Sequence, residues 1–168
     1  GANPHYWLSL ANARIISTNI LNELKAADPA GSEYYDQNAA GFLSELELAD
    51  QEIKTILGRI TDKNIITMHD AWPYFARDYG INVVATFEPY PGSEPTPQYL
   101  AELSRTAKKY NVKTIFSEPQ LSSQLLSAFL EDLGMNLAVL DPEGGLPGRE
   151  SYIDLMKFNA QSIHGALK

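Results

Sequence analysis

The sequence contains no cysteine, and its 13 Lys and Arg residues are outnumbered by 21 Asp and Glu residues, which gives a net charge of −8. The absence of thiols excludes disulfides, cysteine nucleophiles and thiolate zinc sites, so a bound metal needs His, Asp or Glu ligands. The basic residues form no stripe along the sequence, which argues against a nucleic-acid partner. An acidic chain of this kind is better suited to binding small cations.

Long apolar runs and common enzyme signatures are also absent. No run approaches the roughly 18 apolar residues that span a bilayer. The chain opens Gly-Ala-Asn-Pro-His-Tyr-Trp, without an initiator Met or a leader, so we interpret this start as a cut end and expect any membrane anchor to lie outside the chain. The sequence has no Gly-x-Ser-x-Gly elbow, no Gly-rich phosphate loop and no His-Glu-x-x-His helix.

The periodicity of the apolar residues divides the chain into two parts. It predicts a first helix over residues 10–24 and a second over about 33–60, which at 1.5 Å per residue would be roughly 42 Å long. Beyond residue 61, short apolar runs alternate with helical patterns. Strands are predicted at 64–68, 83–87, 114–116 and 137–140, and helices at 71–79, 97–110, 121–133 and 151–167.

Strands that alternate with helices indicate right-handed crossovers and a parallel sheet covered on both faces. The predicted fold class is therefore α/β, with a four-stranded parallel sheet lobe flanked by helices and preceded by a long connecting helix. We expect residues 62–168 to form one compact lobe and residues 1–60 to be appendages of it.

Ionisable side chains follow every predicted strand: His69 and Asp70 the first, Glu88 the second, Glu118 the third and Asp141 the fourth. In open parallel sheets, ligands bind at the carboxyl ends of the strands, so these residues are candidates for a divalent cation site. Capping of the following helices is an alternative role for Asp70, Glu118 and Asp141. His69 beside Asp70 is an arrangement in which a carboxylate orients a metal-binding imidazole.

The other two histidines lie outside this predicted rim. His164 is near the end of the final predicted helix, where a cation suits the helix dipole. His5 lies before the first predicted helix, 64 residues from His69 and therefore in no local metal motif.

Four short stretches resemble one family, the zinc- and manganese-specific solute-binding proteins of ABC importers. They are Asn-Pro-His-Tyr-Trp-Leu at 3–8, Met-His-Asp-Ala-Trp-Pro-Tyr-Phe at 68–75, Ser-Glu-Pro-Gln at 117–120 and Leu-Asp-Pro-Glu-Gly-Gly at 140–145. The resemblance implies two lobes joined by one long helix, with the metal in the cleft between them. Residues 1–30 would be the tail of the amino-terminal lobe, 31–61 the connector helix and 62–168 the carboxy-terminal lobe.

Carried over by motif, the family's metal ligands are His5, His69 and Asp141, with Asp70 and Glu118 as supporting or alternative ligands. A further His, expected in the missing amino-terminal lobe, has no counterpart, so we expect a fragment with an incomplete site. Water is the alternative to Asp141. His69, where relatives carry His or Glu, favours zinc over manganese.

The resemblance also implies function and location. We expect extracytoplasmic metal capture, in the periplasm or at the cell surface with a lipid anchor, and delivery to an ABC permease without enzymatic activity. One rival is a metal-dependent hydrolase with Glu118 or Asp70 as the base. Another is an adhesion module that presents Trp7, Tyr34 and Tyr35 as an exposed aromatic patch.

Overall fold

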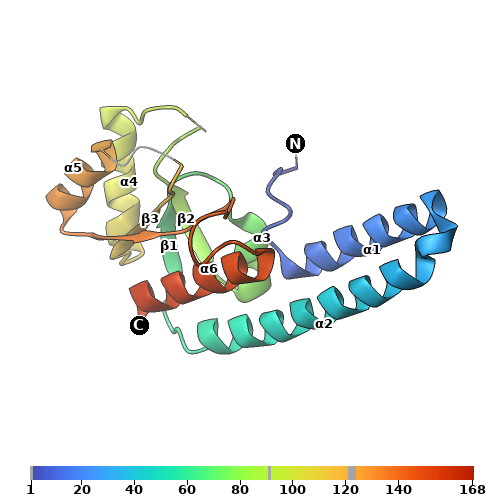
Figure 1. Cartoon of the computed structure of the whole chain (residues 1–168). Coiled ribbons are helices and arrows are strands. Elements are labelled where there is room, and N and C mark those ends of the chain that lie inside the picture. Colours follow the sequence, from blue (N-terminus) through green and yellow to red (C-terminus); the bar gives the residue numbers. More distant parts are fainter. Residues whose placement is uncertain (1, 91, 121–123) are drawn as a thin grey trace.

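The computed structural model describes residues 2–90, 92–120 and 124–168, which form a three-layer α/β lobe and a projecting helical hairpin (Figure 1). The elements, in chain order, are α1 (Leu10–Ala27), a short 3-10 turn η1 (Pro29–Gly31), α2 (Ser32–Leu57), β1 (Asn64–Thr67), α3 (Pro73–Tyr79), β2 (Asn82–Thr86), α4 (Pro97–Lys109), β3 (Thr114–Ser117), α5 (Gln124–Leu133), β4 (Asn136–Val139) and α6 (Tyr152–Leu167). None of the described helices is long and apolar enough to cross a membrane.

The four strands form one parallel sheet in the order β2-β1-β3-β4, which confirms the predicted fold class. Ile66 of β1 pairs with Ile115 of β3, so these two form the centre of the sheet. The chain leaves β1 for β2 on one side and returns to β3 on the other. The loops after β1 and β3 therefore diverge, and this topological switch point is where open α/β sheets bind ligands.

Alternating strand residues supply two separate cores. Ile65 faces α2, α3 and α6, whereas its neighbour Ile66 faces α4 and α5. Both isoleucines are fully buried, as expected for strands covered on both faces. The sheet is thus a rigid platform whose carboxyl edge is left open for loops.

The α1–α2 hairpin extends from the lobe on one side only (Figure 1). Leu8 and Leu10, together with Leu46 and Ile53 of α2, lie in the same core as α3 and α6. The start of α1 and the second half of α2 are therefore packed into the lobe, whereas the other end of the hairpin projects from it (Figure 1). The far end of the hairpin is held by local polar contacts, such as the 2.6 Å ion pair between Lys25 and Asp36.

Element boundaries follow the sequence closely, with local adjustments. The long helix ends at Leu57, three residues before the predicted end, and Gly80 (φ +66°) ends α3 in the left-handed conformation that glycine accepts without strain. The helix α3 begins at Pro73, because Ala71 is part of a tight turn in which its N–H donates to the His69 carbonyl. The first part of the predicted helix 121–133 lies outside the described residues.

Two leucines of α2 provide a test of this packing. Leu46 is completely buried in the core shared with α6, whereas Leu48 is 64% exposed. We expect Leu46→Ala to lower the free energy of unfolding by about 3 kcal/mol, because it removes buried methyl groups and leaves a cavity. Leu48→Ala, the same change on the same helix, should alter it by about 0.5 kcal/mol or less. Urea denaturation measures both, and equal losses would contradict the packing.

Candidate metal centre

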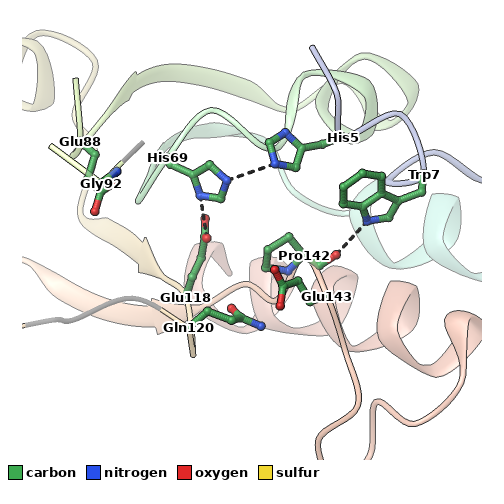
Figure 2. Close-up of a pocket in the computed structure, with 9 residues that line it drawn as sticks. All are labelled: His5, Trp7, His69, Glu88, Gly92, Glu118, Gln120, Pro142 and Glu143. Carbon is green, nitrogen blue, oxygen red and sulfur yellow. Dashed lines mark hydrogen bonds and ion pairs between the residues drawn. The ribbon is translucent and has the colours of Figure 1, made fainter. Parts of the chain in front are cut away.

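A cavity of about 200 Å³ opens at the carboxyl edge of the sheet, where the loops after β1 and β3 diverge (Figure 2). His69 lies two residues after the end of β1, and Glu118 directly follows β3. The segment before α1 crosses this edge and brings His5 to the same place. The cavity is lined by His5, Trp7, His69, Glu88, Gly92, Glu118, Gln120, Pro142 and Glu143.

The neighbours of His5 determine which of its ring nitrogens carries hydrogen. The Asn3 Oδ1 atom accepts the His5 backbone N–H at 3.0 Å, while Asn3 Nδ2 donates to the Asp70 carbonyl at 2.6 Å. These main-chain partners fix the orientation of the Asn3 amide. Because Oδ1 can only accept, the His5 Nδ1 atom at 2.9 Å must donate to it. The lone pair of neutral His5 therefore lies on Nε2.

His69 is oriented in the same way by a carboxylate. Its Nδ1 atom lies 2.6 Å from Oε2 of Glu118, which is only 4% exposed. The other carboxylate oxygen, Oε1, is buried without a hydrogen-bond partner among the described residues. A carboxylate on Nδ1 makes that nitrogen the donor and leaves Nε2 of neutral His69 as the acceptor, which is the usual arrangement behind a metal-bound imidazole.

The two Nε2 atoms face each other at 3.3 Å (Figure 2). Zinc binds imidazole nitrogens at about 2.0–2.1 Å, so two nitrogens on one tetrahedral zinc ion are about 3.3 Å apart. The spacing of this pair therefore matches two corners of a tetrahedral zinc site. No third His, Asp or Glu side chain among the described residues completes such a group.

The electrostatics of the pair are unequal. Burial, and then the charge of His69, lower the pKa of His5 below 6.5, although Glu118 and Asp70 oppose this. The hydrogen bond to Glu118 raises the pKa of His69 above 6.5 and outweighs its burial. As the pH falls, His69 is therefore protonated before His5, and Nε2 of His69 then donates to Nε2 of His5. Metal and proton compete for the same position.

Of the five residues that the resemblance gives as ligands or supporting ligands, the structure links three at this edge: His69 contacts His5 through Nε2 and Glu118 through Nδ1. Asp70 is near them but accepts from Asn3 Nδ2 at 3.2 Å, so Glu118, not Asp70, orients His69. Asp70 does not cap α3, whose first turn has no side-chain cap. Asp141 is completely buried and is not among the residues that line the cavity.

Asp141 is enclosed by donors. Burial alone would raise the pKa of its carboxyl group, but hydrogen bonds from the Gly144 N–H, the Gln120 side chain and the Glu143 N–H, with the charge of Arg149, hold the pKa below 3.8. The carboxylate does not cap α6 either, because Ser151 does so.

Sequence reasoning did not single out Asn3 or Gln120, which also shape the site. Asn3 lies two residues before His5, the spacing at which an Asn side chain accepts from the backbone in an Asx turn, and this signal was available. Gln120 lines the cavity and donates to Asp141 at 2.9 Å, a long-range contact without a local sequence pattern.

Comparison with known proteins assigns the chain to a family. Residues 1–166 match the family described as zinc-uptake complex component A, periplasmic. The chain belongs to this zinc-uptake family. The resemblance noted from the four short motifs is thereby confirmed over nearly the whole chain.

Individual members of the zinc-uptake family agree with this assignment. The high-affinity zinc uptake system protein ZnuA of Bacillus subtilis is 32% identical over 98% of this chain and 53% of its own length. A crystal structure of ZnuA has a TM-score of 0.89 at 35% identity and covers 99% of this chain and 61% of that one. The laminin-binding protein Lmb of Streptococcus agalactiae, described as bifunctional with adhesin and metal transporting activity, has a TM-score of 0.87 at 28% identity, covering 99% of this chain and 65% of that one.

The chain spans only part of the length of these relatives, from 32% to 53% among the curated sequences. The matched part contains both facing imidazoles and the whole sheet.

Replacing Glu118 by Gln should test the orientation of His69. The raised pKa of His69 stabilises the folded chain fully below pH 6.5, and this contribution is lost as the pH rises through the folded pKa. In Glu118→Gln we expect the pKa of His69 to fall, because the charged acceptor on Nδ1 is gone. NMR titration of the imidazole Cε1–H signals measures this directly, since the chain has only three histidines.

The matched control is Glu143→Gln, which neutralises another glutamate of the cavity that does not contact His69. It should leave the pKa of His69 close to its value in the unmodified chain. An equal decrease in both variants would show that the general negative charge of the cavity, and not the contact with Glu118, sets the pKa.

Proposed function

We propose that this chain captures zinc outside the cytoplasm for delivery to an ABC permease, with Nε2 of His5 and Nε2 of His69 as ligands. One observation carries the proposal: the two Nε2 atoms are 3.3 Å apart, and their neighbours leave a lone pair on each. The family description, a periplasmic zinc-uptake component, supports both the metal and the location.

The donor set favours zinc over manganese. Imidazole nitrogen suits zinc, whereas carboxylate and water oxygen suit manganese. Both fixed donors in this chain are nitrogen, and the nearest carboxylate, that of Glu118, already accepts from His69. Manganese remains the alternative cargo to test.

We propose that the coordination shell is completed from outside the described residues. Two imidazoles fill two corners of a tetrahedron, and no third His, Asp or Glu among the described residues joins them. Relatives are longer than this chain, which fits a second lobe that supplies a further ligand, as the motif resemblance implies. In the chain alone, water would occupy the remaining positions.

The α1–α2 hairpin supports a second lobe independently. Among the residues of α1, only Leu10 and Ala13 are buried, while the apolar side chains of Ile15, Ile20 and Leu24 are 42–61% exposed. A contiguous exposed apolar patch marks an interaction surface, and Ile20 and Leu24 line one such hollow together with Phe42 of α2. We propose that the exposed face of α1 and the first half of α2 contact the amino-terminal lobe.

The hydrolase alternative is less well supported. The two carboxylates named as its base are already engaged: Oε2 of Glu118 lies on the His69 imidazole, and Asp70 accepts from Asn3. The adhesion alternative rested on one aromatic patch. Trp7 instead lines the cavity. Tyr34 lies at the other end of α1, whose 18 residues are about 27 Å long, so the two side chains do not form one patch.

Histidine variants of the chain test the proposal. Saturating zinc should raise the thermal midpoint of the chain, because a ligand that binds only the folded state stabilises it. His5→Ala and His69→Ala should each remove most of this increase and of the heat of zinc binding. Differential scanning and isothermal titration calorimetry provide the two measurements, with Mn²⁺ titrated in parallel and expected to produce a smaller shift.

His164→Ala is the matched control, because His164 lies in the last turn of α6, at the opposite end of that helix from the cavity loops. Its response to zinc should equal that of the unmodified chain. If His69→Ala binds zinc as tightly as His164→Ala, the assignment of the ligands is wrong.

A further inference from the structure

Both oxygens of the Asp141 carboxylate accept hydrogen bonds, from its own loop and from Gln120 after β3. Its Oδ1 atom accepts from the Gln120 side chain at 2.9 Å and from the N–H groups of Glu143 and Gly144 at 3.0 Å each. Its Oδ2 atom accepts from Arg149 at 3.0 Å. With zero exposure and four donors, this carboxylate has no oxygen directed to the cavity.

The main chain of Asp141 is fixed as well. The Asn159 side chain of α6 accepts the Asp141 N–H and donates to the Asp141 carbonyl, both at 2.8 Å. Asn159 is itself fully buried. Asn159 of α6 therefore anchors the start of the loop that follows β4, before this loop turns toward the cavity.

Within the same loop, Gly144 and Gly145 pack against the Arg149 carbonyl. Gly144 has φ +80°, and a Cβ atom at this position would meet the Arg149 carbonyl at 3.0 Å. The Gly145 N–H donates to that carbonyl at 2.9 Å, and the Arg149 guanidinium lies 4.3 Å from the centre of the Phe158 ring. Residues 141–149 thus form one closed unit, which we call the Asp141 loop, with the carboxylate at its centre.

The Asp141 loop and the start of α6 hold the segment that carries His5. The Pro142 carbonyl, next to Asp141, accepts from Trp7 Nε1 at 2.9 Å (Figure 2). The Tyr152 hydroxyl donates to the Trp7 carbonyl at 2.7 Å. Trp7 is thus held by both its side chain and its main chain, and its ring lies 5.3 Å from that of His5.

We infer that Asp141 is a positioning residue for His5 and not a metal ligand, and that it acts through the Asp141 loop, Pro142 and Trp7. The inference rests on the proposed function, in which His5 binds zinc. It differs from the ligand role that the motif resemblance gives to Asp141. A metal ion could use this carboxylate only by displacing the Arg149 guanidinium and breaking the hydrogen bonds within the loop.

X-ray absorption of the zinc complex separates the two roles, combined with zinc affinities from competition with a chromophoric chelator. In Asp141→Asn, whose amide oxygen can still accept from the loop, we expect the numbers of nitrogen and oxygen neighbours of zinc to stay unchanged. The affinity should fall by about tenfold, the usual effect of losing a residue that orients a ligand. Loss of one oxygen neighbour in this variant would overturn the inference.

Arg149→Lys is the second variant, and it preserves the Asp141 carboxylate while weakening the ion pair that holds it. If Asp141 positions His5, this variant should also bind zinc more weakly. If Asp141 were a ligand, a carboxylate released from Arg149 would bind zinc as tightly as before or more tightly, and that result would contradict our inference. The second variant keeps the test decisive should Asp141→Asn fail to fold.

Tyr152→Phe removes only the hydroxyl that holds the Trp7 carbonyl. Tyr152 is not among the residues that line the cavity. We expect weaker zinc binding with unchanged neighbours of zinc, and unchanged affinity would contradict the clamp on Trp7. Failure of the proposed function itself has a separate signature: the unmodified chain would show no imidazole scattering around zinc.

Discussion

The contact on which the site depends is the one between two imidazole nitrogens, Nε2 of His5 and Nε2 of His69. Two neutral lone pairs repel each other at 3.3 Å, so the pair needs a proton or a cation between them. Asn3 and Glu118 enforce this by occupying the Nδ1 atoms on the outer sides of the two rings. Each outer partner is in turn fixed by its surroundings, which makes the pair a prearranged site for a cation.

The sheet determines where this pair forms. Because β1 and β3 are adjacent but their following loops diverge, His69 and Glu118 emerge side by side at the switch point. Glu118 is buried there, and one of its oxygens has no hydrogen-bond partner within the described part of the chain. Such burial is costly for an isolated carboxylate, and the imidazole offsets this cost. The segment before α1 then covers the edge, and its Leu8 and Leu10 secure it in the main core. The apolar packing of Leu8 and Leu10, together with the hydrogen bonds of Trp7, keeps His5 in place.

Much of this was predictable from the sequence, because periodicity and strand ends are local signals. The rule that parallel strands place their carboxyl ends together puts His69 and Glu118 at one rim. The pairing of His5 with His69 was not predictable from spacing, since 64 residues separate them and the contacts of Trp7 that bring them together are long-range. Nor does the sequence reveal that Arg149 holds Asp141, because that pair depends on how the loop closes.

Glu118 and Asp141 show how equal positions acquire different chemistry. Glu118 follows the central strand β3, and Asp141 comes after the edge strand β4 of the same sheet. Both residues are at least 96% buried. Glu118 has an imidazole as its partner, so its charge acts on the ligand beside the cavity. Asp141 has a guanidinium and three further donors, so its charge is already neutralised. Breaking one partner from a buried ion pair costs about 3–5 kcal/mol, and a metal would have to exceed this before gaining from that oxygen. The partner of each carboxylate, rather than its place at a strand end, therefore decides which one serves the metal.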